Sequence, residues 1–162
     1  MKINLFEDTH RNAFLPLCYT RPVAALRVGV VTIAEKYERV MNAEVGYFTH
    51  ASLLDMYKFF SDASYQINAR VVPTASWMQA LSSLKEGQRF MKDGVILAEH
   101  FGDDEPELIE YSGELELLQG ITDVFTHNAM ALKEDFAWLT AGRISAPMHA
   151  SVTLIGPSDQ LF

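Results

Sequence analysis

The feature that most constrains the fold is an alternation of strand-like and helix-like segments over residues 2–84. The strand-like segments are rich in β-branched and aromatic residues, and the helix-like segments repeat apolar residues at helical spacing. They give strands at 2–6, 44–49 and 64–73, and helices at 32–41, 51–60 and 77–84. Such an order is typical of a sheet covered by helices. We therefore predict an α/β fold with a mainly parallel or mixed sheet and helices on both faces.

The pattern changes in the second half of the chain. Residues 90–101 indicate a hairpin that turns at Asp93-Gly94, and residues 102–116 are strongly acidic. An amphipathic helix is predicted at 128–139, whose apolar face carries Met130, Phe136 and Leu139. We assign residues 1–150 to one α/β domain and expect a short strand and an apolar finish in residues 151–162.

Composition limits the partners and the compartment. The chain has 162 residues and a net charge of −8, without the basic patch that a nucleic-acid surface needs. No apolar run approaches the ~20 residues of a membrane span. Cys18 is the one cysteine, which is typical of a reducing compartment. We expect a cytoplasmic protein with neither a nucleic acid nor a membrane as partner, and Cys18 as a small apolar core residue.

The connection between the first strand and the first helix is unusually long, from Glu7 to Val31. Long ordered loops in compact domains are often functional. The loop carries three arginines, Arg11, Arg21 and Arg27, whose guanidinium groups could bind phosphate in a bidentate fork. Glu7 and Asp8 directly follow the strand, at the edge where open α/β sheets bind ligands, and could hold a metal. The alternative is that Glu7, Asp8 and Arg11 form a local ion-pair set that shapes the loop.

Two further polar residues end the third strand. Asn68 and Arg70 lie at the same predicted edge, where they could read a base or a phosphate. A turn-capping Asn beside a solvated Arg is the alternative. Arg143 could reach the same cleft, but we favour a place at the carboxyl end of the preceding helix, with Gly142 at C′. The five histidines show no metal-binding spacing.

The long loop resembles the N-terminal signature of the sugar-phosphate nucleotidyltransferases. In that family a glycine-rich G-x-G-T-R loop precedes P-L-T, then P-K-P, a V-G step and a helix that starts near I-x-E. The matching residues here are Pro16-Leu17-Cys18, Thr20-Arg21-Pro22, Val28-Gly29 and Ile33-Ala34-Glu35. The phrases "TRPVAALRVGVVTI", "INARVVPT" and "TAGRISAPMHASVTLIGP" are similar to a divergent branch related to the N-terminal domain of bacterial N-acetylglucosamine-1-phosphate uridyltransferase.

The resemblance implies a reduced nucleotide-diphospho-sugar transferase-like (Rossmann-like) fold. It implies transfer of a nucleotidyl group from a nucleoside triphosphate to a sugar 1-phosphate, with release of pyrophosphate and with Mg²⁺ as cofactor. The partners would be a nucleoside triphosphate and a sugar phosphate, or a nucleotide-sugar. In that branch a left-handed β-helix of acyltransferase type follows, so residues 151–162 would begin a linker to it, and the full-length protein would be a homo-oligomer, in particular a trimer.

The site residues expected from the resemblance lie on this frame. The catalytic residues would be Arg11 and Arg21, the metal ligands Glu7 and Asp8, and the nucleotide or phosphate contacts Asp8, Thr20, Arg27, Asn68 and Arg70. Three positions depart from the family pattern: "FEDTHRNAF" replaces the glycine-rich loop, Val23 replaces the P-K-P lysine, and Arg70 stands where an acid is expected. These departures leave open a non-catalytic domain that binds a nucleotide-sugar or supports assembly of a β-helical acyltransferase. A bare interaction module is the third class.

Overall fold

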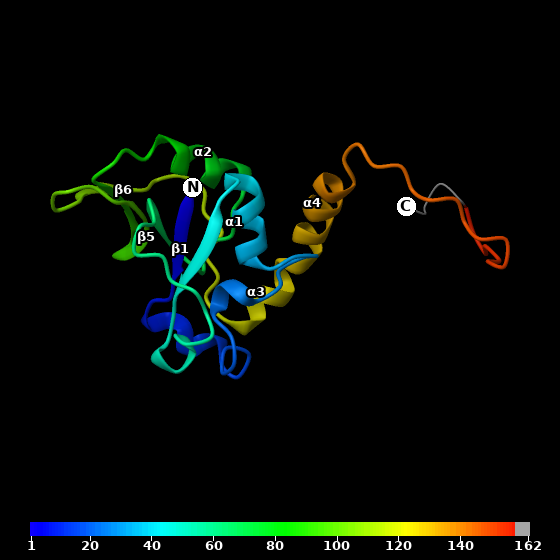
Figure 1. The fold of residues 1–162 in the computed structure, drawn as a ribbon, viewed down its shortest axis with the longest axis horizontal. Coiled ribbons are helices and arrows are strands. Elements are labelled where there is room, and N and C mark those ends of the chain that lie inside the picture. Colours follow the sequence, from blue (N-terminus) through cyan, green and yellow to red (C-terminus); the bar gives the residue numbers. More distant parts are fainter. Residues whose placement is uncertain (158–162) are drawn as a thin grey trace.

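A computed structural model describes residues 1–157 and contains one mixed six-stranded sheet (Figure 1). The strand order is β2-β1-β3-β5-β4-β6. The strands are β1 (Lys2–Phe6), β2 (Glu44–Phe48), β3 (Tyr65–Asn68), β4 (Gln88–Lys92), β5 (Val95–His100) and β6 (Glu107–Glu110). β1 is parallel to β2 and to β3, β4 is parallel to β6, and β5 is antiparallel to both of its neighbours. The predicted α/β fold is confirmed.

The boundary between β1 and β3 is the topological switch point of the sheet. β2 lies on one side of β1 and β3 lies on the other, so the order of the parallel strands switches there. Phe6, the last residue of β1, pairs with Phe48 on one side and with Asn68 on the other. The carboxyl ends of the three strands therefore meet at one edge, where open α/β sheets place their ligands.

Two helices cover one face of the sheet. α1 (Ile33–Met41) begins with the predicted capping box, in which Thr32 and Glu35 exchange side-chain and backbone hydrogen bonds. α2 (Ala75–Ser83) begins at Thr74, whose side chain accepts from the Trp77 backbone N–H. Inside the core, the Trp77 indole donates to the Tyr37 hydroxyl at 2.9 Å. Both helices are thus held to the same core as well as to the sheet.

The helix predicted at 51–60 is wrong. Only a single 3₁₀ turn forms, η3 (Ala51–Leu53), and the chain then runs back along β2. The Asn4 side chain donates to the Phe60 carbonyl at 2.8 Å and accepts from the Phe60 N–H at 3.1 Å. Tyr47 N–H donates to the Lys58 carbonyl at 2.7 Å. Backbone groups that a helix would use internally are therefore bonded to the sheet.

The predicted hairpin is confirmed, with β4 and β5 joined at Asp93 and Gly94, which both have positive φ. The acidic stretch after it contains β6, a strand that the sequence did not predict. β6 extends the sheet beyond β4 as its second edge strand.

A helical arm follows the sheet and is made of α3 (Ile121–Thr126) and α4 (Asn128–Thr140). The predicted apolar face of α4 is wrong, because Met130 and Phe136 are about half exposed and Ala131 and Asp135 are buried. Asp135 accepts from the Val30 N–H at 2.8 Å and from the buried Lys36 ammonium. An inward-facing carboxylate thus fixes α4 against the loop before α1 and against α1 itself.

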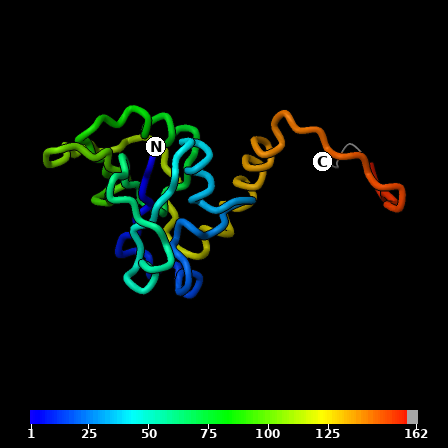
Figure 2. Tube along the Cα trace, viewed as in Figure 1, coloured from blue at the N-terminus to red at the C-terminus, as the bar shows by residue number. Residues whose placement is uncertain are grey.

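The segment after α4 leads away from the body of the domain (Figures 1 and 2). Residues 151–157 form turns and no strand, contrary to the prediction for this segment. The rest of the predicted apolar finish, residues 158–162, lies outside the described residues. Among the helices of residues 1–157, none is long and apolar enough to cross a membrane.

Candidate functional site

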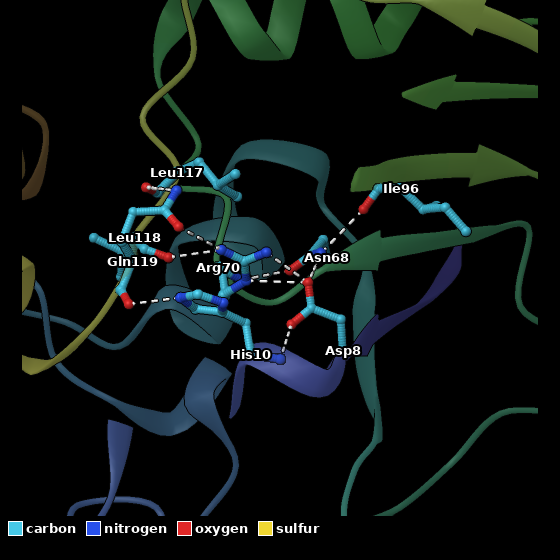
Figure 3. Close-up of polar contacts among 8 residues, drawn as sticks. All are labelled: Asp8, His10, Asn68, Arg70, Ile96, Leu117, Leu118 and Gln119. Carbon is cyan, nitrogen blue, oxygen red and sulfur yellow. Dashed lines mark hydrogen bonds and ion pairs between the residues drawn. The ribbon is translucent and has the colours of Figure 1, made fainter. Parts of the chain in front are cut away.

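Asp8 and Asn68 meet at the carboxyl ends of β1 and β3. The register pairs Phe6 with Asn68, so the residues that follow β1 lie beside the end of β3. Asn68 Nδ2 donates to Asp8 Oδ2 at 2.9 Å and also to the Ile96 carbonyl of β5 at 3.0 Å (Figure 3). The sequence prediction that these two polar residues share one edge of the sheet is thereby realised in the structure.

Arg70 completes this cluster from the loop after β3. Its Nε and Nη2 donate to Asp8 Oδ2 at 3.1 and 2.6 Å. Its backbone N–H donates to Asn68 Oδ1 at 3.0 Å, which forms the Asn turn that was the alternative interpretation. The Arg70 side chain is only 3% exposed and is therefore not solvated, contrary to the second half of that alternative.

The far side of the Arg70 guanidinium contacts residues from the second half of the chain. Nη1 donates to the Leu118 carbonyl at 3.1 Å and to Gln119 Oε1 at 3.3 Å. Gln119 also offers its carbonyl to His10 Nε2 at 2.9 Å (Figure 3). A single guanidinium thus ties the end of β3, the end of β1 and the 117–119 segment together.

The cluster keeps Asp8 ionised. Burial alone would raise the pKa of Asp8, but hydrogen bonds from Arg70 and Asn68, the charge of Arg70 and the backbone N–H of His10 outweigh burial. The pKa of Asp8 is therefore lowered below its ordinary value of 3.8. A negative charge that is three-quarters buried persists at this edge at neutral pH, with its counterion beside it.

Glu7 faces the opposite way from Asp8 and forms a second cluster. Its Oε1 accepts from the Val23 N–H at 2.7 Å. Its Oε2 accepts from Arg11 Nε at 3.2 Å, from His50 N–H at 3.1 Å and from the Thr49 hydroxyl. Arg11 continues the cluster by donating to the Cys18 carbonyl. The ion-pair set predicted for Glu7, Asp8 and Arg11 is thus divided into two separate clusters.

The loop tip between Cys18 and Val23 is exposed. Cys18 is buried as predicted, and burial first and the charge of Glu7 second raise the pKa of its thiol to about 11. The next three residues, Tyr19, Thr20 and Arg21, all face solvent. Within residues 1–157, no hydrogen bond or ion pair holds the Arg21 side chain. This part of the long loop therefore presents two hydroxyls and a guanidinium to the outside.

The remaining two arginines lie elsewhere. Arg27 donates to the Val30 carbonyl within its own turn and lies near Glu35, whose pKa its charge helps to lower after the hydrogen bonds from Thr32. Arg143 follows α4, and its N–H donates to the Thr140 carbonyl at 2.9 Å. Gly142 has a φ of +71° at the predicted C′ position. Arg27 therefore does not join either carboxylate cluster.

The carboxylates do not fit a preformed magnesium site. A Mg²⁺ ion held by two carboxylates needs both in one octahedral shell, whereas Glu7 and Asp8 belong to two separate clusters. Every carboxylate oxygen of Glu7 and of Asp8 already accepts a hydrogen bond from the protein. No group of three or more His, Cys, Asp and Glu side chains among residues 1–157 is arranged to hold a metal. We therefore assign no chemical step to a metal held by Glu7 and Asp8.

A separate cavity of about 430 Å³ lies between α1, α4 and the start of α2. Its walls are mainly apolar, and they include Trp138, Met78 and Val72. None of the site residues predicted from the sequence lines it. The polar clusters at the edge of the sheet remain the candidate site.

Sequence reasoning missed Gln119 and the carbonyl of Leu118 as partners of Arg70. No local signal marks them, because 49 residues separate Gln119 from Arg70 and 109 separate it from His10. Only the pairing of the 117–118 segment with residues 70–71 brings these groups to the site: Leu118 N–H donates to the Arg70 carbonyl at 2.9 Å.

The fold and the site define an α/β domain with a polar cluster at the switch point of its parallel strands. Residues 3–144 match the sugar nucleotidyl transferase family, so the chain belongs to this family. No curated protein and no solved structure matches the chain.

Proposed function

We propose that this domain binds a nucleoside triphosphate or a nucleotide-sugar at the carboxyl ends of β1 and β3, and that it transfers a nucleotidyl group to a sugar 1-phosphate with release of pyrophosphate. The observation that carries the proposal is the Asp8–Asn68–Arg70 cluster at the switch point. The long loop that contains Asp8 also carries the exposed Arg21 at its tip. Membership of the family supports the reaction class.

The groups of this cluster and of the loop tip suit the chemistry. Nucleotidyl transfer is an in-line attack on the α-phosphorus, and the protein contributes mainly positioning and positive charge. Arg21 can supply that charge, because a guanidinium binds two phosphate oxygens at once and no protein group among the described residues competes for it. Thr20 adds a hydroxyl donor beside it. The buried Arg70 acts on Asp8 and would shape the site rather than contact phosphate.

A second candidate function is a catalytically inactive domain that binds a nucleotide-sugar or supports assembly of an acyltransferase. Two observations favour it: Val23, which replaces the signature lysine, is 1% exposed and packs in the core, and every oxygen of the two carboxylates accepts at least one hydrogen bond from the protein. A buried valine cannot meet a sugar phosphate. The two candidates differ in the ligand that they should prefer.

We also propose the more detailed expectations of the sequence analysis. These are the branch related to N-acetylglucosamine-1-phosphate uridyltransferase, a Mg²⁺ ion that arrives with the triphosphate, a β-helical neighbour domain, a trimeric assembly and a cytoplasmic location. The sequence resemblance supports all of them except the cytoplasmic location, which the single cysteine, Cys18, supports.

A thermal-shift panel tests the proposal. We would use ATP, GTP, CTP, UTP and UDP-N-acetylglucosamine, each with and without Mg²⁺. A ligand at a hundred times its dissociation constant adds about 2.7 kcal/mol, which raises the melting temperature of a domain this size by about 5–10 °C. A Mg²⁺-dependent rise with one triphosphate supports transfer, and a rise with the nucleotide-sugar alone supports the nucleotide-sugar-binding form of the second candidate. No rise with any ligand contradicts both transfer and nucleotide-sugar binding.

A further inference from the structure

Glu7 reaches two loops that are far apart in the sequence. Its carboxylate is only 3% exposed and joins Arg11 and Val23 of the long loop to Thr49 and His50 after β2. Charge-assisted hydrogen bonds in a partly dry site are stronger than neutral ones. The carboxylate therefore fixes where the long loop leaves and re-enters the body of the domain.

Arg11 fixes the other end of the loop tip. Its guanidinium bonds Glu7 Oε2 through Nε and the Cys18 carbonyl through Nη2, and its side chain is 11% exposed. Cys18 immediately precedes the tip, and Val23, which Glu7 holds, follows it after Pro22. The two ends of the tip are thus attached to one ion pair.

The side chains of the tip face solvent rather than the rest of the protein. Tyr19 is 66% exposed, and Thr20 and Arg21 are exposed beside it. An aromatic ring, a hydroxyl and a guanidinium in a row are groups that bind a base or sugar face and a phosphate. Ordering such side chains only on binding would cost conformational entropy, so a backbone fixed in advance favours affinity.

We propose that Glu7 and Arg11 are positioning residues that present Tyr19, Thr20 and Arg21 to the nucleotide, and that neither contacts the reacting atoms. This assignment rests on the proposed function for its ligand. It replaces, for these two residues, the metal-binding and catalytic roles expected from the resemblance.

Two measurements on Glu7→Gln test the proposal. Chymotrypsin cleavage after Tyr19, followed by mass spectrometry of the 1–19 fragment, reports the order of the tip. Loss of the carboxylate charge should release the tip and speed this cleavage at least about tenfold, because cleavage of a folded chain follows its local opening. Glu44→Gln is the matched control, since Glu44 is exposed and pairs only weakly with Lys58 at 3.8 Å. Its cleavage should equal that of the wild type.

A double-mutant cycle between Glu7→Gln and Arg21→Ala, with UTP binding by calorimetry, separates positioning from general stability. Arg21→Ala should weaken UTP binding about tenfold in the wild-type background. In the Glu7→Gln background it should have almost no further effect, because Arg21 is already displaced. Additive losses, together with unchanged cleavage at Tyr19, would overturn the proposal.

Two other outcomes are also decisive. If Glu7→Gln does not fold, Arg11→Lys takes its place in both measurements, because an ammonium keeps the charge but lacks the two separate nitrogens, Nε and Nη2, that Arg11 uses for Glu7 and the Cys18 carbonyl. If wild-type protein does not bind UTP or any other ligand of the panel, the proposed function fails. The cleavage measurement then decides alone whether Glu7 and Arg11 fix the tip.

Discussion

Arg70 donates two hydrogen bonds to one carboxylate oxygen of Asp8, at 2.6 and 3.1 Å, across the boundary between β1 and β3. The two side chains differ in exposure: that of Arg70 is 3% exposed and that of Asp8 is 24% exposed. Asp8 is thus the member that can meet a ligand, and Arg70 is the member whose burial depends on the pair.

Asp8→Asn should destabilise the protein by about 2–4 kcal/mol, because it leaves the buried Arg70 cation without its counterion. Urea unfolding at neutral pH measures the loss. Asp104→Asn, an exposed position in the acidic stretch, is the control and should change stability by less than about 0.5 kcal/mol. Equal stabilities of the two variants would contradict the role assigned to the pair.

Acid should weaken the fold through the same residue. Since the pKa of Asp8 is lowered in the folded protein, the unfolded chain takes up the proton first as the pH falls. The contribution of Asp8 is then complete above about pH 5 and declines as the pH drops through its lowered folded pKa. Urea midpoints measured from pH 7 to pH 3 should fall more steeply in the wild type than in Asp8→Asn. Parallel curves would assign the acid sensitivity to other carboxylates.

Lys36→Met should cost about 3–5 kcal/mol, because it leaves the Asp135 carboxylate buried without a cation. Lys36→Met combined with Asp135→Asn should be the more stable protein of the two, since the asparagine can still accept from the Val30 N–H without a buried charge. Guanidinium chloride unfolding of both variants makes the comparison. A double variant that is less stable than the single one would argue against an electrostatic origin.

Gly29→Ala should be among the most damaging single substitutions. Gly29 has a φ of +95°, and an added Cβ would lie 2.3 Å from Asp135 Oδ2 and 3.0 Å from the Ala131 backbone. Gly87→Ala is the matched control, because Gly87 also has a positive φ, +76°, but open space around it. The control should lose about 1 kcal/mol from backbone strain alone. Gly29→Ala should lose several times more, and equal melting temperatures would exclude the steric cause.

Local pattern predicted the parts of the fold that local physics determines. The capping box of Thr32 and Glu35 and the turn at Asp93 and Gly94 need only neighbouring residues, and both are present as predicted. The segment 51–60 has helical spacing, but its backbone bonds to Asn4 and Tyr47 are long-range and outweigh that preference. Asp135 determines which face of α4 points inward, because it bonds to Val30 and Lys36. These partners lie about a hundred residues away in the sequence, so no local pattern shows them.

At the site, too, the features that depend on long-range contacts are the ones that the sequence did not predict. The edge that gathers Asp8 and Asn68 follows from the parallel pairing of β1 and β3, which the alternation of strands and helices in the sequence favours. The buried state of Arg70 does not, because it depends on the carbonyl of Leu118 and the side chain of Gln119. The four donors around Glu7 likewise come from two loops that only the finished sheet brings together.

The opposite orientations of Glu7 and Asp8 limit how a chain of this design can change. Successive side chains of an extended segment point to opposite sides, so one inserted or deleted residue after Phe6 would exchange the two carboxylates and disconnect both clusters together. The tip between Cys18 and Val23 lies outside that alternation, and the Glu7–Arg11 pair holds it at its two ends, Cys18 and Val23. Divergence among related chains should therefore keep the count of residues from Phe6 to Arg11 fixed, while the length of the tip can vary around the side chains that meet the nucleotide.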